Sequence, residues 1–293
     1  MFNNFLILIP VNKFRESLIK TVKYYLEFDC NIVIVDSSRK KINFHEKRVK
    51  IEHYPDLNFY QKIHNTLSKY PENNILLSPD DDVINISEIN YVYNDFVEDK
   101  NVALVFGQVM QTYESQKYKI YARPFLKRKD INKFRNIYKK IDYHCFNYDL
   151  LLWSLYKKDF LLDCMNDLIN LNLKNDNFIE LVILFNLINN GGYLKTKNFW
   201  LLRNIMSSDH WGSRHNAVSE NDVLDINKFI KYYKKKYKID YSYYFINKFI
   251  KSSKLRILKY KYLFFIININ IIPIIRYFKI TNKFKSIKNY LSY

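Results

Sequence analysis

Short apolar runs alternate with segments of helical period along the first 107 residues of the chain. The runs are apolar at consecutive positions, which is typical of strands buried on both faces. In the segments between them, apolar residues recur three and four positions apart, which predicts helices with one buried side. This alternation predicts an α/β fold in which helices flank a mostly parallel sheet. The predicted strands are residues 5–9, 31–35, 49–54, 75–78 and 102–107, and the predicted helices are residues 14–28, 58–70 and 86–97.

The pattern is less regular beyond residue 107. Residues 108–140 show no sustained period, and structureless loops of that length are uncommon, so we expect a functional insertion or a mobile flap there. Residues 142–173 are apolar and helical in tendency. Residues 176–189 predict an amphipathic helix with Gly191 at its C-cap, and residues 193–202 return as extended chain.

Three of the predicted strands end next to candidate site residues: Pro10 and Asp36 follow their strands directly, and the run Asp80–Asp82 comes after Pro79. Because parallel strands end at the same edge of a sheet, these residues should gather where open α/β sheets bind ligands. Three adjacent carboxylates disfavour each other's ionisation. A divalent cation reverses that effect, so the run predicts a seat for Mg²⁺ or Mn²⁺, with a ligand's phosphates completing the shell. The alternative is a solvated acidic turn that caps the helix beginning near Ile86.

Composition and charge divide the chain into two parts. With 293 residues, 48% of them hydrophobic, the chain can bury one large α/β core and still carry an appendage. The net charge of +18 lies mostly in the last 66 residues, which contain 17 Lys and Arg and only one acidic residue. We therefore expect a near-neutral domain over residues 1–225 and a basic, aromatic helical segment over residues 226–293. Three cysteines without metal-ligand spacing favour a reducing compartment, and the N-terminus does not read as a signal peptide.

Taken together, these landmarks resemble the GT-A nucleotide-sugar glycosyltransferases, and within them the family-2-like bacterial group that builds surface polysaccharides. The resemblance covers roughly residues 3–215 and rests on Ile9-Pro10, Val35-Asp36, the Asp80–Asp82 run, and an acid-bearing helix followed by Gly-Gly-Tyr. It implies a GT-A fold and a metal-dependent enzyme that moves a sugar from a nucleotide donor to a surface glycan. Capsule, O-antigen and lipooligosaccharide are such glycans, and the implied outcome is inversion at the sugar.

The resemblance also implies roles on the donor side of the site. Pro10 and Asn12 would border the nucleotide, and Asp36 would bind its base or ribose. Mn²⁺ or Mg²⁺ would neutralise the departing diphosphate, with Asp82 as a ligand and a late histidine, His210, completing the shell. Arginines 203 and 214 could hold the diphosphate by bidentate contacts. The donor-binding candidates are Pro10, Asn12, Asp36, Asp80, Asp81, Arg203 and Arg214.

Inverting transfer needs a carboxylate that takes the proton of the acceptor hydroxyl. Asp176 and Glu180 lie four positions apart, so a helix would present both on one face near its N-terminus. We favour Glu180 as the base, since Asp176 could instead cap the helix; both could also be plain surface acids. The acceptor-binding candidates are His144, Trp153 and Trp211, of which Trp211 could equally belong to the core.

The basic segment interleaves lysine with tyrosine, phenylalanine and isoleucine, which suits an anionic membrane or a nucleic acid. Its most apolar stretch, residues 262–275, is shorter than the ~20 residues of a membrane-spanning helix. We therefore expect a protein peripheral on the inner face of a bacterial cytoplasmic membrane, or a segment that packs on the catalytic domain. Two alternatives remain open: a nucleotidyl- or phospho-transferase using the same carboxylates, or a nucleic-acid-binding protein.

Overall fold

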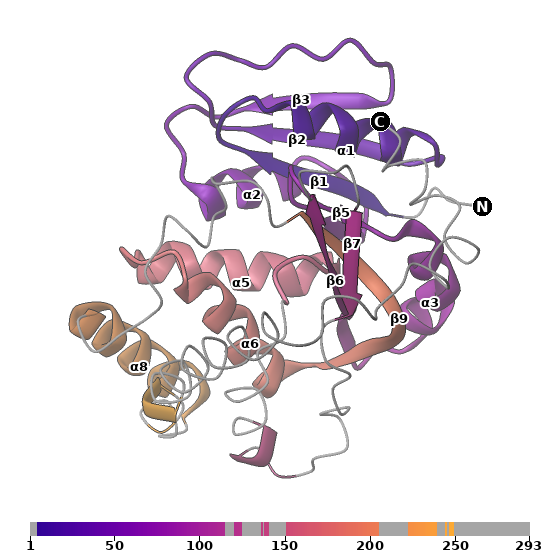
Figure 1. Ribbon diagram of the computed structural model, residues 1–293. Coiled ribbons are helices and arrows are strands. Elements are labelled where there is room, and N and C mark those ends of the chain that lie inside the picture. Colours follow the sequence, from indigo (N-terminus) through magenta and orange to yellow (C-terminus); the bar gives the residue numbers. More distant parts are fainter. Residues whose placement is uncertain are drawn as a thin grey trace, which may run out of the picture.

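A nine-stranded sheet forms the centre of the molecule in the computed structural model (Figure 1). The structure describes residues 5–114, 120–124, 136, 138–140, 151–204, 222–238, 244 and 246–248. The strand order is β3-β2-β1-β4-β8-β6-β9-β5, and β7 pairs with β6 outside this path. The strands are β1 (Leu6–Val11), β2 (Asn31–Asp36), β3 (Val49–His53), β4 (Asn74–Leu77), β5 (Val83–Ile84), β6 (Val102–Glu114), β7 (Ile120–Pro124), β8 (Leu155–Lys157) and β9 (Gly192–Asn204).

The first four strands of that order pair in parallel, as the apolar runs predict. β1 lies between β2 and β4, and all six of its residues are buried. The chain moves outward from β1 through β2 to β3, then returns past β1 to form β4 on its other side. The direction of strand addition therefore reverses between β1 and β4, which is where open α/β sheets bind ligands. The predicted α/β fold with flanking helices is confirmed.

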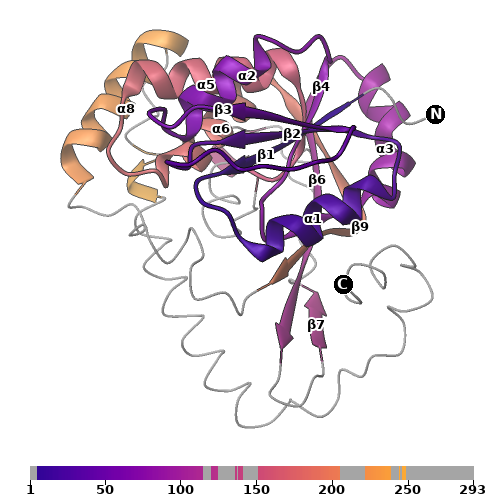
Figure 2. The ribbon, with the colours of Figure 1, turned by 90° about the horizontal axis from the view of Figure 1, so that it is seen from above.

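The other half of the sheet is mixed, and the sequence did not indicate all of it. β8 pairs antiparallel with both β4 and β6, so the prediction of helical chain was wrong for residues 155–157. Three residues are too few to show the alternation typical of a strand, and β8 is extended because it pairs with β4 on one side and β6 on the other. Residues 108–114 and 120–124, where we expected a functional insertion or a mobile flap, form the β6–β7 hairpin (Figure 2).

Helices cover both faces of the sheet (Figure 2). One face carries α1 and α3 with one hydrophobic cluster, and the other carries α2, α5, α6 and α8 with a second. The start of α2 follows from local chemistry, because Asn58 and Gln61 form a reciprocal capping box. The helices are α1 (Glu16–Leu26), α2 (Phe59–Leu67), α3 (Ile86–Glu98), α5 (Lys158–Leu171), α6 (Phe178–Asn190) and α8 (Val223–Tyr237).

Helix α6 is buried nearly all round, so the prediction of one apolar side was wrong. It lies between the sheet and α8, and every residue from Leu181 to Leu187 is buried. Gly191 is the C-cap residue of α6, as predicted, but its φ of −160° is extended backbone rather than the left-handed conformation common at helix ends. Glycine is required there by close approach: a Cβ at Gly191 would lie 2.8 Å from the Cβ of Ala103.

The predicted boundary between residues 225 and 226 falls inside α8. Phe229 and Tyr233 of this helix are fully buried, and both rings lie against Phe185 of α6. The first turns of the basic segment therefore pack on the α/β domain. The apolar stretch at residues 262–275 lies outside the described residues. Within the described ranges, no helix combines the length and apolar character that crossing a membrane requires.

Candidate functional site

A cleft of about 260 Å³ opens where β1 and β4 end, at the point where strand addition reverses. Its walls come from segments far apart in the sequence: the end of β1 and the turn after it, the residue after β2, the start of α2, the chain after β4, the chain before β8, the chain before α6, and the end of β9. Position and lining agree with a ligand site of an open α/β sheet. The cleft is lined by Pro10, Val11, Asn12, Arg15, Ser37, Leu57, Asn58, Phe59, Lys62, Pro79, Asp80, Asp81, Asp82, Trp153, Asp176 and Arg203.

The acidic turn, Asp80–Asp82, is held in place at both ends by one residue of α1. The Tyr25 hydroxyl lies 2.7 Å from the Ser78 hydroxyl before the turn and accepts the Ile84 backbone N–H at 2.9 Å after it. Val83 and Ile84 then pair with β9 as the short strand β5. The turn is therefore not a loose solvated loop, because packing and hydrogen bonds fix where its carboxylates point.

Two of the three carboxylates face an arginine. Asp80 is 8% exposed and forms an ion pair with the Arg15 guanidinium. Burial and the neighbouring charge of Asp81 raise the pKa of Asp80 to about 6, and Arg15 lowers it in part. Asp82 is 3% exposed, and its Oδ2 lies 4.0 Å from the Arg203 Nε. The structure thus brings together the acidic turn and Arg203, both of which the sequence singled out.

The chemistry of the acidic turn suits a hard divalent cation, since carboxylate oxygens are the ligands that Mg²⁺ and Mn²⁺ prefer. Among the described residues, however, no three histidine, cysteine, aspartate or glutamate side chains are grouped as a metal site. His210, the expected further ligand, lies outside the described residues. Asp82 could contribute one ligand, and the cation stays a prediction.

Lys62 is a residue of the cleft that sequence reasoning missed. Its side chain is buried, and its ammonium donates to the Val11 carbonyl at 2.6 Å and the Ser37 hydroxyl at 2.9 Å. Burial lowers its pKa to about 8, while the charges of Asp36 and Asp80 act in the opposite direction. The available signal was its position on the inward side of α2, four residues before the buried Thr66.

Arg15 was missed as well. It is the N-cap residue of α1, where a positive charge is unfavourable next to the helix dipole. Asp80, 65 positions further along the chain, offsets that charge through an ion pair with Arg15. The sequence around Arg15 does not indicate this partner, because it belongs to a distant segment.

Asp36 occupies a different place from the one expected. It is fully buried, and its two carboxylate oxygens accept the backbone N–H groups of Ser38 at 2.8 Å and Ile42 at 3.0 Å. The carboxylate thus organises the loop that follows β2. Ser37, rather than Asp36, lines the cleft, so the geometry gives no support for a direct contact between Asp36 and a base or ribose.

Of the two candidate bases, Asp176 lines the cleft and Glu180 is not among the lining residues. Glu180 lies in the first turn of α6. The geometry therefore favours Asp176, against the preference drawn from the sequence. Trp153 also lines the cleft, and its carbonyl accepts the Trp200 indole N–H at 2.9 Å. Four further candidates lie outside the described residues: His144, His210, Trp211 and Arg214.

Comparisons with known proteins establish the fold. No protein-family model matches the chain, and no curated protein matches its sequence. The crystal structure of residues 1–349 of S. aureus TarS in complex with UDP-GlcNAc is similar, with a TM-score of 0.58 at 12% identity. That alignment covers 85% of this chain and 72% of the TarS chain. The same fragment in complex with UDP gives a TM-score of 0.47 at 10% identity, covering 82% and 73%. The chain has a GT-A-like fold.

Proposed function

We propose that the protein is a nucleotide-sugar glycosyltransferase whose donor binds in the cleft between the ends of β1 and β4. One observation carries the proposal: an acidic turn and three cations, Arg15, Lys62 and Arg203, line a single cleft at the reversal point of the sheet. A diphosphate needs positive charge around it, and the acidic turn can hold a cation that adds more. The similar TarS structure contains UDP-GlcNAc, which supports a donor of this class.

In the proposed transfer, different residues of the chain stabilise the leaving group, take the proton of the acceptor and bind the acceptor sugar. Arg203 and Lys62 stabilise the negative charge that grows on the leaving diphosphate, because both reach the same cleft. Asp82, with His210, would hold Mn²⁺ or Mg²⁺, which supplies further charge neutralisation when bound. Asp176 takes the proton of the acceptor hydroxyl as that oxygen attacks the anomeric carbon, and the configuration inverts. Trp153 offers a ring against which the acceptor sugar can stack.

The acceptor in this proposal is a bacterial surface glycan such as capsule, O-antigen or lipooligosaccharide. We place the transfer at the inner face of the cytoplasmic membrane, where the protein would act as a peripheral enzyme. The strongly basic end of the chain supports that location, since the inner leaflet is anionic.

The test measures donor hydrolysis by the full chain with Mn²⁺ and a panel of sugar nucleotides. We expect release of a nucleoside diphosphate from one donor, and loss of most of that activity in Asp82→Asn. Asp95→Asn, an exposed carboxylate of α3, is the matched control and should behave as wild type. Release of pyrophosphate would instead indicate nucleotidyl transfer and refute the proposal. Unchanged activity in Asp82→Asn would refute the metal role alone.

A further inference from the structure

The aromatic side of helix α8 packs against the rest of the domain. Phe229 and Tyr233 are fully buried against α6, and the Tyr237 ring also lies beside Phe185. The aromatic residues that alternate with lysine in the sequence are therefore engaged with the protein itself over this helix. They are not presented to solvent for stacking on bases or for seating among lipid headgroups, as the sequence pattern had suggested.

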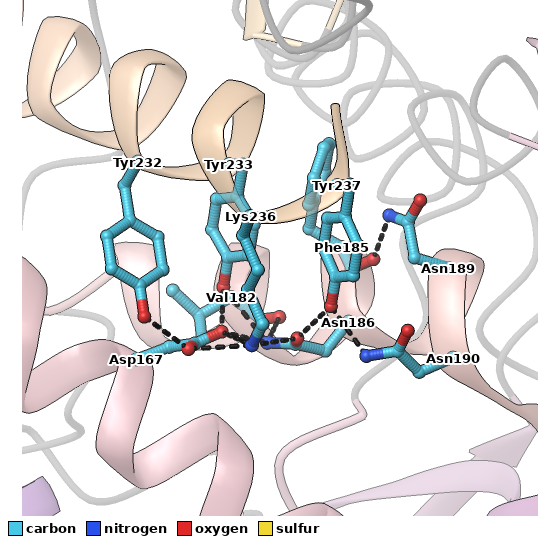
Figure 3. A network of polar contacts seen from close by, with 10 residues as sticks. All are labelled: Asp167, Val182, Phe185, Asn186, Asn189, Asn190, Tyr232, Tyr233, Lys236 and Tyr237. Atoms are coloured by element: carbon cyan, nitrogen blue, oxygen red, sulfur yellow. Dashed lines mark hydrogen bonds and ion pairs between the residues drawn. The ribbon is translucent and has the colours of Figure 1, made fainter. Parts of the chain in front are cut away.

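A buried polar network fixes the rotation of α8 about its own axis (Figure 3). The Asp167 carboxylate of α5 accepts hydrogen bonds from the hydroxyls of Tyr232 at 2.6 Å and Tyr233 at 2.9 Å. It also accepts one from the Lys236 ammonium at 2.7 Å. Asn186 of α6 donates to Asp167 at 2.8 Å and accepts from Lys236 at 3.1 Å. Because these contacts have directional requirements, one side of α8 must face the domain and the opposite side must face outward.

The outward side of α8 carries a lysine stripe, defined as Lys228, Lys231, Lys234 and Lys235, all of them exposed. At 3.6 residues per turn, these lysines with Val223, Leu224 and Asn227 fall within an arc of about 140°. Val223 is 54% exposed and Leu224 is 71% exposed.

Within α8, the acid Asp225 does not weaken the charge of the stripe. Asp225 is buried, and its carboxylate accepts the backbone N–H groups of Lys174 and Asn175. The outward arc of the helix thus combines four positive charges with two exposed aliphatic side chains and contains no acid.

We infer that the outward face of α8 is a docking surface for an anionic phospholipid membrane. The lysine stripe matches the charge of the headgroups, and the exposed Val223 and Leu224 can enter the boundary of the acyl chains. A nucleic acid fits this face less well, because the stripe has no exposed aromatic ring to stack on bases and no arginine fork. The inference deepens the proposed membrane location but does not depend on the transfer reaction.

The test is co-sedimentation of the full chain with phosphatidylcholine vesicles, with and without phosphatidylglycerol, at physiological ionic strength. We expect binding only when the anionic lipid is present. Each neutralised lysine should weaken binding about five-fold, so Lys231→Gln with Lys235→Gln should weaken it about 25-fold. The control, Lys20→Gln with Lys47→Gln, removes the same charge from exposed positions away from α8 and should change binding little.

Four outcomes would overturn the inference. The first three are absence of binding by the wild type, equal loss of binding in both double variants, and binding that survives in Lys231→Gln with Lys235→Gln. Retention of an oligonucleotide more tightly than vesicles, lost in that same variant, would assign the face to nucleic acid and also overturn it. Donor binding without vesicles should be unchanged in both variants, so a failed docking surface and a failed glycosyltransferase proposal give different results.

Discussion

Replacing Asp167 by asparagine should loosen α8 from the domain. Asp167 is 3% exposed, and its oxygens accept hydrogen bonds from two tyrosines, an asparagine and Lys236. Asparagine keeps the shape but removes the charge and one acceptor oxygen. Breaking a fully buried ion pair costs about 3–5 kcal/mol, because a charge is left without a partner. The Lys236 side chain is 28% exposed, so water can solvate its freed ammonium, and we expect a smaller loss of about 2–3 kcal/mol.

Thermal unfolding followed by circular dichroism measures this loss. At about 2–4 °C for each kcal/mol in a domain of this size, the melting temperature should fall by about 4–12 °C. Asp163→Asn is the matched control, since that carboxylate is exposed on the same helix and should stay within about 0.5 kcal/mol of wild type. Hydrogen exchange should rise in the amides of α8 before it rises in β1 or β4.

An unchanged melting temperature and unchanged exchange in Asp167→Asn would refute this account of α8. In that case the aromatic contacts of Phe229 and Tyr233 alone would hold the helix, and its rotation would not depend on the polar network. A double-mutant cycle with Lys236→Met separates the ion pair from the two tyrosine hydrogen bonds.

Three further predictions follow from individual residues. Because the pKa of Lys62 falls from 10.5 to about 8 on folding, the unfolded chain binds more protons between these values. Urea unfolding should therefore show stability rising with pH across that window in the wild type relative to Lys62→Met, and parallel profiles would contradict the burial argument. Gly107→Ala places a Cβ 2.2 Å from the Thr196 hydroxyl oxygen, so denaturant unfolding should show a loss of stability of about 1–3 kcal/mol. Stability equal to that of the wild type would mean that β6 and β9 can move apart at this position. In steady-state assays, Asp176→Asn should lower transfer at least ~100-fold with donor affinity retained, whereas Glu180→Gln should keep most activity; the reverse order would restore Glu180 as the base.

Local sequence was sufficient for most of the elements. In β1, and in β2 from Ile32 to Val35, consecutive positions are apolar, so burial on both faces of the sheet can be predicted without knowing the neighbouring strands. The acidic turn could likewise be found from sequence, because a strand, a proline and three carboxylates are consecutive. The strand β8 could not be found this way, since only its neighbours β4 and β6 make three residues extended.

Only the tertiary structure determined which side chains, distant from one another in sequence, lie together in the cleft. Arg15 pairs with Asp80, and Lys62 donates to the carbonyl of Val11, which lies 51 positions earlier in the sequence. No periodic pattern in the sequence predicts either contact. The same holds for the candidate base, because the carboxylate spacing of four allowed both residues and only the walls of the cleft select Asp176. Hydrophobic periodicity records whether a residue is buried, but a charged contact depends on how elements are placed relative to one another, which only the assembled sheet and helices determine.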